Sequence, residues 1–369
     1  MDFRWTEAQA LLVSTARGFF QHHCPTTLVQ QMALDPQGFP VDLWRQISAL
    51  GWPGLLIPSA LEGNDGSLLD VILLVEEMGR ACFPSPYIHS AVVATVLLLA
   101  AGSPAQQVHL LPAMARGERL CTVALTEASA DFTPDAVHMA GEIGGCLNGS
   151  KLFVKDAHIA DHVLVVVRGG GGFNLFLLDR GQPGITLLPL DTMSGEKLFE
   201  VLFTDVPLSA EALLGPAGGG WQMLEPGLQM GALARGAEIV GCAQRILDIC
   251  VDYAKGREQS GQPIGAFQAI QHHCADMLRN VESSRYILYN AAWRMTAGLS
   301  CATEVAMAKA HVSDACLWVA RQGHQILGAI SYCEEHPMHL YHKRIQAAGL
   351  DFGDAALHLE TVATAIGLV

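Results

Sequence analysis

One stretch decides the fold of this chain: REQSGQPIGAFQAIQ, residues 257–271. It joins the end of a predicted amphipathic helix to a short Gly/Pro turn, and then begins a second helix that carries glutamines. An Arg guanidinium can bind a pyrophosphate through two parallel hydrogen bonds, so the stretch suits a phosphate-bearing cofactor or a neighbouring subunit. The alternative for Arg257 is a capping role near the last carbonyls of the preceding helix.

The residues on both sides of this stretch predict a bundle of long helices in the C-terminal part, residues 216–369. Apolar residues recur at helical spacing in four segments, at 233–254, 269–298, 302–327 and 345–366. Long helices without internal breakers indicate a four-helix bundle.

The middle part, residues 119–215, has a different pattern. Short runs rich in β-branched or aromatic residues occur at 120–125, 147–154, 163–167, 175–178 and 198–204. Gly, Asn, Asp and Pro separate these runs, which predicts a small antiparallel barrel or sandwich. Four consecutive glycines at 169–172 are expected to connect a hairpin. A phosphate-binding role for them is disfavoured because no helix follows.

The N-terminal part, residues 1–118, is predicted to be helical. Thr6 is the expected N-cap of the first helix, and further helices are expected at 41–50, 68–78 and 91–101. The predicted fold class is therefore α+β, with an N-terminal helical domain, a middle antiparallel β-barrel domain and a C-terminal four-helix bundle.

Composition excludes several classes of function. The 369 residues carry a net charge of −14, whereas nucleic-acid binding needs clustered Lys and Arg. No apolar window suits a membrane span, so the 50% hydrophobic content is assigned to core and subunit interface. The ten cysteines form no CxxC pattern, which predicts free thiols in a reducing compartment. The first residues carry no secretory or transit signal, so we expect a cytoplasmic protein.

Short motifs along nearly the whole chain resemble those of the flavin-dependent acyl-CoA dehydrogenase family. In chain order they lie at 50–58, 76–79, 124–127, 148–151, 160–161, 206–220, 257–277 and 325–332. The resemblance implies the three-part fold, FAD as cofactor, an acyl-CoA substrate and a homo- or hetero-oligomer built from dimers or tetramers. It also implies an electron-transfer flavoprotein as electron acceptor.

The resemblance places the flavin ring against the middle part. Its contacts would be Leu125 and Thr126 on one strand, and Phe153, Val154 and Lys155 on the neighbouring strand. Lys155 stands where the family has a Thr that hydrogen-bonds the flavin edge. A cation there would favour reduced, anionic flavin. The alternative is that no flavin binds this β-domain.

The resemblance also implies that the bundle covers the adenine and pyrophosphate of a neighbouring subunit's FAD. Arg257 would bind the phosphates, and Gln268 would contact the ribityl or adenosine portion. Gln325 and Gly328 belong to the family's Q-x-x-G-G loop. Ala329 replaces the second Gly of that loop and adds a side chain where backbone should approach phosphate.

The glutamate that the family uses as catalytic base is missing from both of its usual positions. In the loop after the third bundle helix the aligned residue is Phe352, and on the first bundle helix it is Gly231 or a neighbour. Asp351 is the expected stand-in for the base. The alternative is that Asp351 is the N-cap of a helix.

Five residues depart from the family pattern at flavin and base positions: Ala128, Lys155, Ser260, Ala329 and Phe352. In the first hypothesis, the chain is an FAD-dependent acyl-CoA dehydrogenase that introduces a C2–C3 double bond into an acyl-CoA thioester. In the second, it is a degenerate partner subunit of a heteromeric enzyme, resembling the branch that acts on steroid- and dicarboxyl-CoA. It would then contribute to a shared FAD site but not the base. A third hypothesis is a binding protein without redox chemistry.

A group of histidines, His336, His339 and His342, has a spacing that zinc could use. Pro337 interrupts this segment, and a surface cluster is the favoured interpretation. We therefore predict no metal site.

Overall fold

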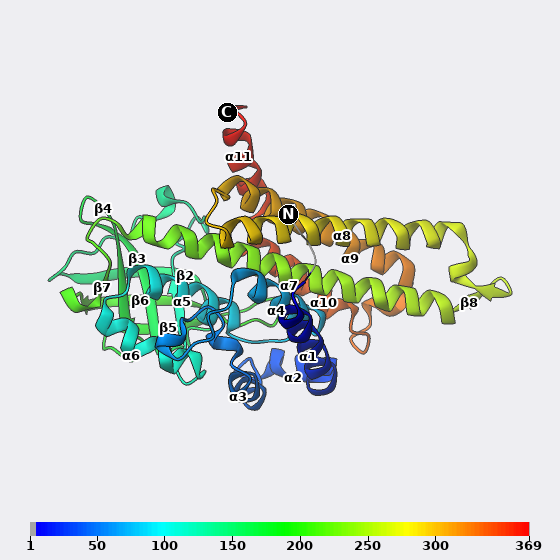
Figure 1. The fold of residues 1–369 in the computed structure, drawn as a ribbon, viewed down its shortest axis with the longest axis horizontal. Helices are drawn as coiled ribbons and strands as arrows, with labels where there is room; N and C mark the ends of the chain where they lie inside the picture. The colour runs from blue at the N-terminus through cyan, green and yellow to red at the C-terminus, as the bar shows by residue number, and fades with distance from the viewer. Residues whose placement is uncertain (1–4, 369) are drawn as a thin grey trace. The chain divides into compact units, whose positions relative to one another are not determined.

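The computed structural model describes residues 5–368, and its elements follow the predicted order of helices, strands and helices (Figure 1). The N-terminal helices are α1 (Glu7–His23), α2 (Thr26–Leu34), α3 (Val41–Ala49), α4 (Leu68–Arg80), α5 (Thr95–Ala101) and α6 (Pro104–Ala115). The strands that follow are β1 (Cys121–Ala124), β2 (Cys146–Lys155), β3 (His162–Gly169), β4 (Gly172–Asp179), β5 (Ile185–Leu190), β6 (Leu198–Pro207) and β7 (Leu213–Leu214). The C-terminal elements are α7 (Gly220–Gly256), β8 (Glu258–Gln259), β9 (Gln262–Pro263), α8 (Gln268–Thr296), α9 (Ala302–Leu327), α10 (Met338–Leu350) and α11 (Ala355–Ala365).

Two compact units make up the described residues. The helical unit comprises the residues up to Gln31, Leu68–Phe83 and the residues from Ala232 onward. The β-unit comprises Met32–Ser67 and Pro84–Gly231. The helical unit is therefore assembled from chain segments that are far apart in the sequence.

The β-unit contains two sheets, with strand orders β1-β3-β4-β7 and β2-β6-β5. Gly169 pairs with Gly172 at the end of the β3–β4 hairpin, where Gly170 and Gly171 have φ of 65° and 79°. A two-residue hairpin turn requires this left-handed conformation, so the predicted hairpin at the glycine run is confirmed. The expectation of purely antiparallel pairing was wrong for β1, which runs parallel to β3 with Cys121 opposite His162. The chain forms β2 in the other sheet before β3 returns beside β1, and such a crossover permits parallel pairing.

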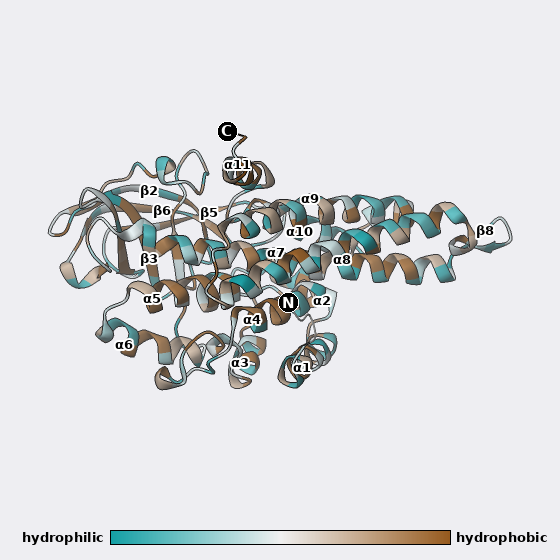
Figure 2. Cartoon of the chain, turned by 45° about the horizontal axis from the view of Figure 1, so that its top comes forward, coloured by the Kyte–Doolittle hydropathy of each residue, from teal (hydrophilic) through white to brown (hydrophobic). Residues whose placement is uncertain are grey.

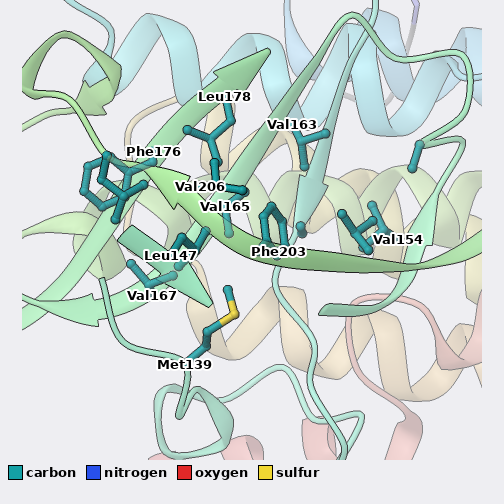
Figure 3. Packing of buried hydrophobic residues seen from close by; sticks show 14 of the residues in the cluster. Met139, Leu147, Val154, Val163, Val165, Val167, Phe176, Leu178, Phe203 and Val206 are labelled. Atoms are coloured by element: carbon teal, nitrogen blue, oxygen red, sulfur yellow. The ribbon is translucent and has the colours of Figure 1, made fainter. Parts of the chain in front are cut away.

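Apolar side chains from both sheets meet in one core (Figure 3). Along β6, Phe199, Val201 and Phe203 alternate with more exposed residues, as the period of two in a strand requires. Strand β5 was not predicted, since its residues Thr186, Leu188 and Pro189 are exposed and give no apolar alternation.

In the helical unit, α8 and α9 lie side by side, and polar and apolar residues alternate around them (Figure 2). A close approach joins α4 to α7: a Cβ on Gly79 would lie 2.2 Å from the Glu238 carbonyl oxygen, and one on Gly241 would lie 2.0 Å from that of Glu76. Only glycine fits at these two positions, so the sequence itself sets the distance between the two helices.

The predicted fourth bundle helix, 345–366, was wrong, because α10 and α11 are separate helices. Phe352 and Gly353 between them have φ of 58° and 95°, which no α-helix accommodates. The predicted helix at 302–327 is confirmed by α9, and the predicted Thr6 N-cap is confirmed by its hydrogen bond from the Gln9 amide.

Among the described residues, no helix combines the length and apolarity needed to cross a membrane.

Candidate functional site

An exposed aromatic ring marks the predicted flavin-facing part of the β-unit. Strand β2 shifts register against β6 between Lys151 and Val154, and Phe153 in this bulge has φ of 57°. Its side chain is 48% exposed, whereas Val154 points into the core. A non-glycine residue in the left-handed region is strained, and such strain is concentrated at functional sites. The bulge therefore presents an aromatic surface where the sequence predicts the flavin.

Backbone hydrogen bonds bring the predicted strand residues together at this bulge. The Leu152 amide donates to the Thr126 carbonyl at 2.8 Å, and the Thr126 hydroxyl donates back to the Leu152 carbonyl. Leu125, Thr126, Phe153 and Val154 therefore lie on neighbouring segments, as predicted. The Thr126 hydroxyl is committed to this internal bond.

A buried ion pair holds these segments in place. The Lys151 ammonium donates to the Leu125 carbonyl at 3.0 Å and to the Glu127 carboxylate at 2.7 Å. Glu127 also accepts from the backbone amide of Met139 at 3.0 Å. Burial lowers the pKa of Lys151, against the effect of Glu127. Burial acts to raise the pKa of Glu127, but Lys151 and the backbone amides outweigh it, so this pKa falls.

Glu127 and Lys151 are the last residues of two family motifs, 124–127 and 148–151, but the sequence did not predict that they form an ion pair. Strand β2 contains other polar residues as well: Asn148, Ser150 and Lys155. The sequence therefore indicated neither that Lys151 is buried nor that it needs a partner.

Lys155 is engaged in a second buried ion pair, with the Glu196 carboxylate. Both side chains are less than a tenth exposed, and the Thr122 hydroxyl donates to the Lys155 carbonyl at 2.6 Å. The pair carries no net charge, so Lys155 does not act as an isolated cation at the predicted flavin edge. Where the family's Thr has a neutral hydroxyl, this chain has an ammonium that is paired with Glu196.

The predicted phosphate-binding residues of the helical unit lie at the ends of its long helices (Figure 1). Arg257 follows α7, Gln268 begins α8, and Gln325 lies in the last turn of α9. All three side chains are exposed. Among residues 5–368, no hydrogen bond joins the Arg257 guanidinium to the last carbonyls of α7, so its capping role finds no support.

Two turns shape this group of helix ends. Ser260 and Gly261 form the β8–β9 hairpin turn with φ of 56° and 80°, so Ser260 lies at an exposed tip. Gly328 ends α9 with φ of 68° and ψ of −145°, a conformation reserved almost entirely for glycine. A Cβ on Gly328 would meet no atom within 4 Å, so backbone conformation rather than crowding requires the glycine.

The loop between α10 and α11 contains the predicted base. Asp351 accepts from the Arg235 Nε at 2.7 Å, and Arg235 also bonds Glu238 at 2.5 Å. Arg344 completes the network by bonding Glu238 at 2.7 Å. Arg235, Glu238 and Arg344 are each about a twentieth exposed or less. Asp354 rather than Asp351 is the N-cap of α11, so the N-cap alternative for Asp351 was wrong.

Phe352 occupies the loop position at which the family places its glutamate, and its side chain is 5% exposed. Beside it, the fully buried Lys309 donates to the carbonyls of Ala348, Gly349 and Gly353 at 3.2, 2.8 and 3.0 Å. Burial lowers the pKa of Lys309 to about 7, although Asp351 acts in the opposite direction. Lys309 and Arg235 thus fix the loop from two sides.

In the part of the chain that the structure describes, no group of three or more His, Cys, Asp or Glu residues could hold a metal ion. His342 instead contacts the His324 ring, with 2.8 Å between nitrogens.

Three family models match the chain in succession. They describe the N-terminal domain of acyl-CoA dehydrogenases at residues 6–118, the middle domain at 122–206 and the C-terminal domain at 218–367. Together they cover most of the chain.

Known proteins agree with these matches. The acyl-CoA dehydrogenase IpdE2 of Mycobacterium tuberculosis is 31% identical, over 92% of this chain and 90% of its own. The butyryl-CoA dehydrogenase structure from Megasphaera elsdenii has a TM-score of 0.91 at 27% identity, covering 99% of this chain and 100% of that one. The ChsE4-ChsE5 complex from Mycobacterium tuberculosis has a TM-score of 0.90 at 26% identity, with both chains fully covered.

Proposed function

The chain belongs to the acyl-CoA dehydrogenase family, and we propose that it is the subunit of a heteromeric enzyme that takes its catalytic base from a partner chain. The chain is an oxidoreductase that acts on acyl-CoA thioesters, and FAD is its cofactor. The reaction introduces a C2–C3 double bond: a base would take the α-proton, and FAD, when bound, would supply the acceptor for the β-hydride.

One observation carries the proposal. The loop position of the family's base is a buried phenylalanine, Phe352, and the neighbouring carboxylate of Asp351 is bonded to the buried Arg235. A carboxylate that accepted the α-proton here would leave two buried guanidiniums, those of Arg235 and Arg344, sharing the single carboxylate of Glu238, which is costly away from water. Asp351 is therefore better suited to holding the loop than to proton transfer.

The β-unit fits a flavin in part. Phe153 offers an exposed ring on a strained bulge, and the Lys151–Glu127 pair holds the strand residues beside it. The Thr126 hydroxyl offers no free donor, because it donates to the Leu152 carbonyl, and the Lys155 ammonium is paired with Glu196. In the helical unit, Arg257, Gln268, Gln325 and Gly328 would hold the phosphate and adenosine portions of a neighbouring subunit's FAD. The similarity to the ChsE4-ChsE5 complex supports a heteromer.

We further propose an electron-transfer flavoprotein as acceptor, on the family resemblance, and a cytoplasmic location, on the ten free cysteines.

The test compares the chain alone with a co-expressed pair. The partner is a family chain that carries a glutamate at the position aligned with Phe352. We expect no acyl-CoA dehydrogenase activity from the chain alone with added FAD, and activity from the pair. In the pair, Asp351→Asn should leave turnover within a few-fold of the unchanged enzyme.

The opposite outcome identifies Asp351 as the base. Activity of the chain alone that Asp351→Asn abolishes, with FAD still bound by its visible absorbance, would overturn the heteromer proposal. That result would restore the hypothesis of an autonomous dehydrogenase.

A further inference from the structure

A cavity of about 340 Å³ lies in the helical unit, away from every residue discussed for the flavin or the base. Helices α1, α4, α7 and α10 and the start of α2 line it. The side chains around it include three guanidiniums, those of Arg17, Arg80 and Arg245, and a single carboxylate, that of Glu77. A protein of net charge −14 therefore gathers positive charge here.

Two of the three arginines have carboxylate partners. Arg17 bonds Glu77 through two nitrogens, at 3.0 and 2.6 Å. Arg80 bonds Asp248 at 2.7 Å and lies 3.8 Å from Glu77. These bonds hold both guanidiniums at the cavity in fixed orientations.

Arg245 has no such partner. Its side chain is half-buried on α7, and within residues 5–368 no carboxylate lies within ion-pair distance of its guanidinium. Its neighbour is the hydroxyl of Tyr341, which is 2% exposed and donates to the Arg80 carbonyl at 3.3 Å. Glu77 is the one carboxylate among the lining residues, and it is bonded to Arg17 rather than to Arg245. A partly desolvated guanidinium without a counter-charge is unfavourable, so a bound anion would remove that cost.

A second cavity serves as an internal comparison. It has about 450 Å³, shares Arg17, Glu77 and Arg80 with the first cavity, and is lined by three arginines and four carboxylates. Those carboxylates are Glu76, Glu77, Asp248 and Glu282. Its lining carries more carboxylates than arginines, so of these two cavities the Arg245 cavity is the one with an excess of positive charge.

We infer that the Arg245 cavity binds a small molecule through its oxyanion, a phosphate or carboxylate group. Arg245 would bind the oxyanion with the guanidiniums of Arg17 and Arg80 beside it, and charge-assisted bonds of this kind are the strongest available. Phe20, Pro25 and Ala81 supply apolar walls for the rest of the molecule. The volume is at the lower end of the range for small-molecule sites, about 300–1,000 Å³.

This site is separate from the predicted FAD phosphate contact. Arg257 lies twelve residues after Arg245, which is about 18 Å along the axis of a helix. The inference does not depend on the source of the catalytic base.

Inorganic phosphate is the probe for the experiment. Isothermal titration and thermal unfolding are measured with the full chain, with NaCl used to hold ionic strength constant. We expect saturable binding and a concentration-dependent rise in Tm. Arg245→Gln should weaken phosphate binding about 10-fold or more, the loss expected for one charge-assisted hydrogen-bonded group. Arg279→Gln is the matched control, since Arg279 is an exposed arginine with a surface partner, and it should bind like the unchanged chain.

Two results would overturn the inference: a phosphate effect that does not saturate, or equal binding by Arg245→Gln while its circular dichroism shows a native fold. Acetate at the same ionic strength distinguishes the two oxyanions. Tighter binding of phosphate assigns the site to phosphorylated molecules, and tighter binding of acetate assigns it to carboxylates.

Discussion

The bulge of β2 and the loop between α10 and α11 correspond to the two halves of the family's chemistry, and they have diverged differently. Phe153 lies half-exposed at a strained position that nothing in the core requires. Phe352 has nearly the same φ, 58° against 57°, but its ring is buried. The first ring is available to a ligand, whereas the second is used in packing. Under the proposed function, the chain would keep its cofactor surface, and the loop at the family's base position would have a structural role.

The largest expected effect is on stability at Phe352. Phe352→Ala should lower the free energy of unfolding by about 3–5 kcal/mol, because it empties a buried site that is fixed by Lys309 and Arg235 and cannot collapse freely. Urea denaturation measures this change. A loss below about 1 kcal/mol would show that Phe352 is not a core residue and would break the comparison.

A smaller effect is expected in the pH dependence of stability at Lys309. Burial lowers the pKa of Lys309 from 10.5 to about 7 in the folded chain. Above pH 7 the unfolded state holds a proton that the folded state lacks, so stability should rise with pH. The contribution of Lys309 to the slope is about 0.7 kcal/mol per pH unit at pH 7, approaches about 1.4 kcal/mol per pH unit near pH 8.5, and fades below about pH 6, where both states are protonated.

Lys309→Met should remove this slope, whereas Lys343→Met, which changes an exposed lysine, should keep it. The comparison of the two variants at equal pH is needed because burial raises the pKa of thiols such as Cys121 to about 12, and these thiols add an opposite slope once they begin to lose protons in the unfolded chain, above about pH 8. Equal slopes in both variants would mean that Lys309 is not the titrating group.

The smallest stability effect is expected at Phe153. Phe153→Ala should change the free energy of unfolding by no more than about 0.5 kcal/mol, since half of the ring is already exposed. Its effect should appear instead in FAD retention of the assembled enzyme, measured by visible absorbance after gel filtration. Full retention of FAD by the variant would show that Phe153 does not contribute to FAD binding.

The sequence predicted elements well wherever a single pattern ran without interruption. The apolar period of 302–327 gave α9 without error at either end, and the glycine run at 169–172 gave its hairpin. The end of α10 before Phe352 was not predicted, because the apolar spacing of the surrounding residues continues through this position. No sequence pattern indicates that a phenylalanine adopts the left-handed conformation. Strand β1 was predicted from its own residues. Its parallel pairing with β3 was not, because that pairing depends on how the chain crosses between the sheets.

The candidate site was predictable only through the resemblance, and its electrostatics were not predictable at all. Lys155 and Glu196 are 41 residues apart, and Arg235 and Asp351 are 116 apart. No local spacing in the sequence connects such partners. The sequence therefore predicted Lys155 as a cation near the flavin, whereas the structure shows it in a neutral ion pair with Glu196. The sequence did identify Asp351 as an acidic neighbour of the missing base, but the structure supplied its counter-charge.

The glycine contact between α4 and α7 has a consequence for how the chain is made. Gly79 leaves the ribosome about 160 residues before Gly241, which at a typical rate of about 5–20 residues per second is a delay of roughly 10–30 s. During that interval α4 presents a face of Val71, Leu74, Val75 and Met78 that is buried only in the finished unit. The packing of α4 against α7 therefore cannot form before translation has passed residue 241, and the rate of translation sets the length of that delay.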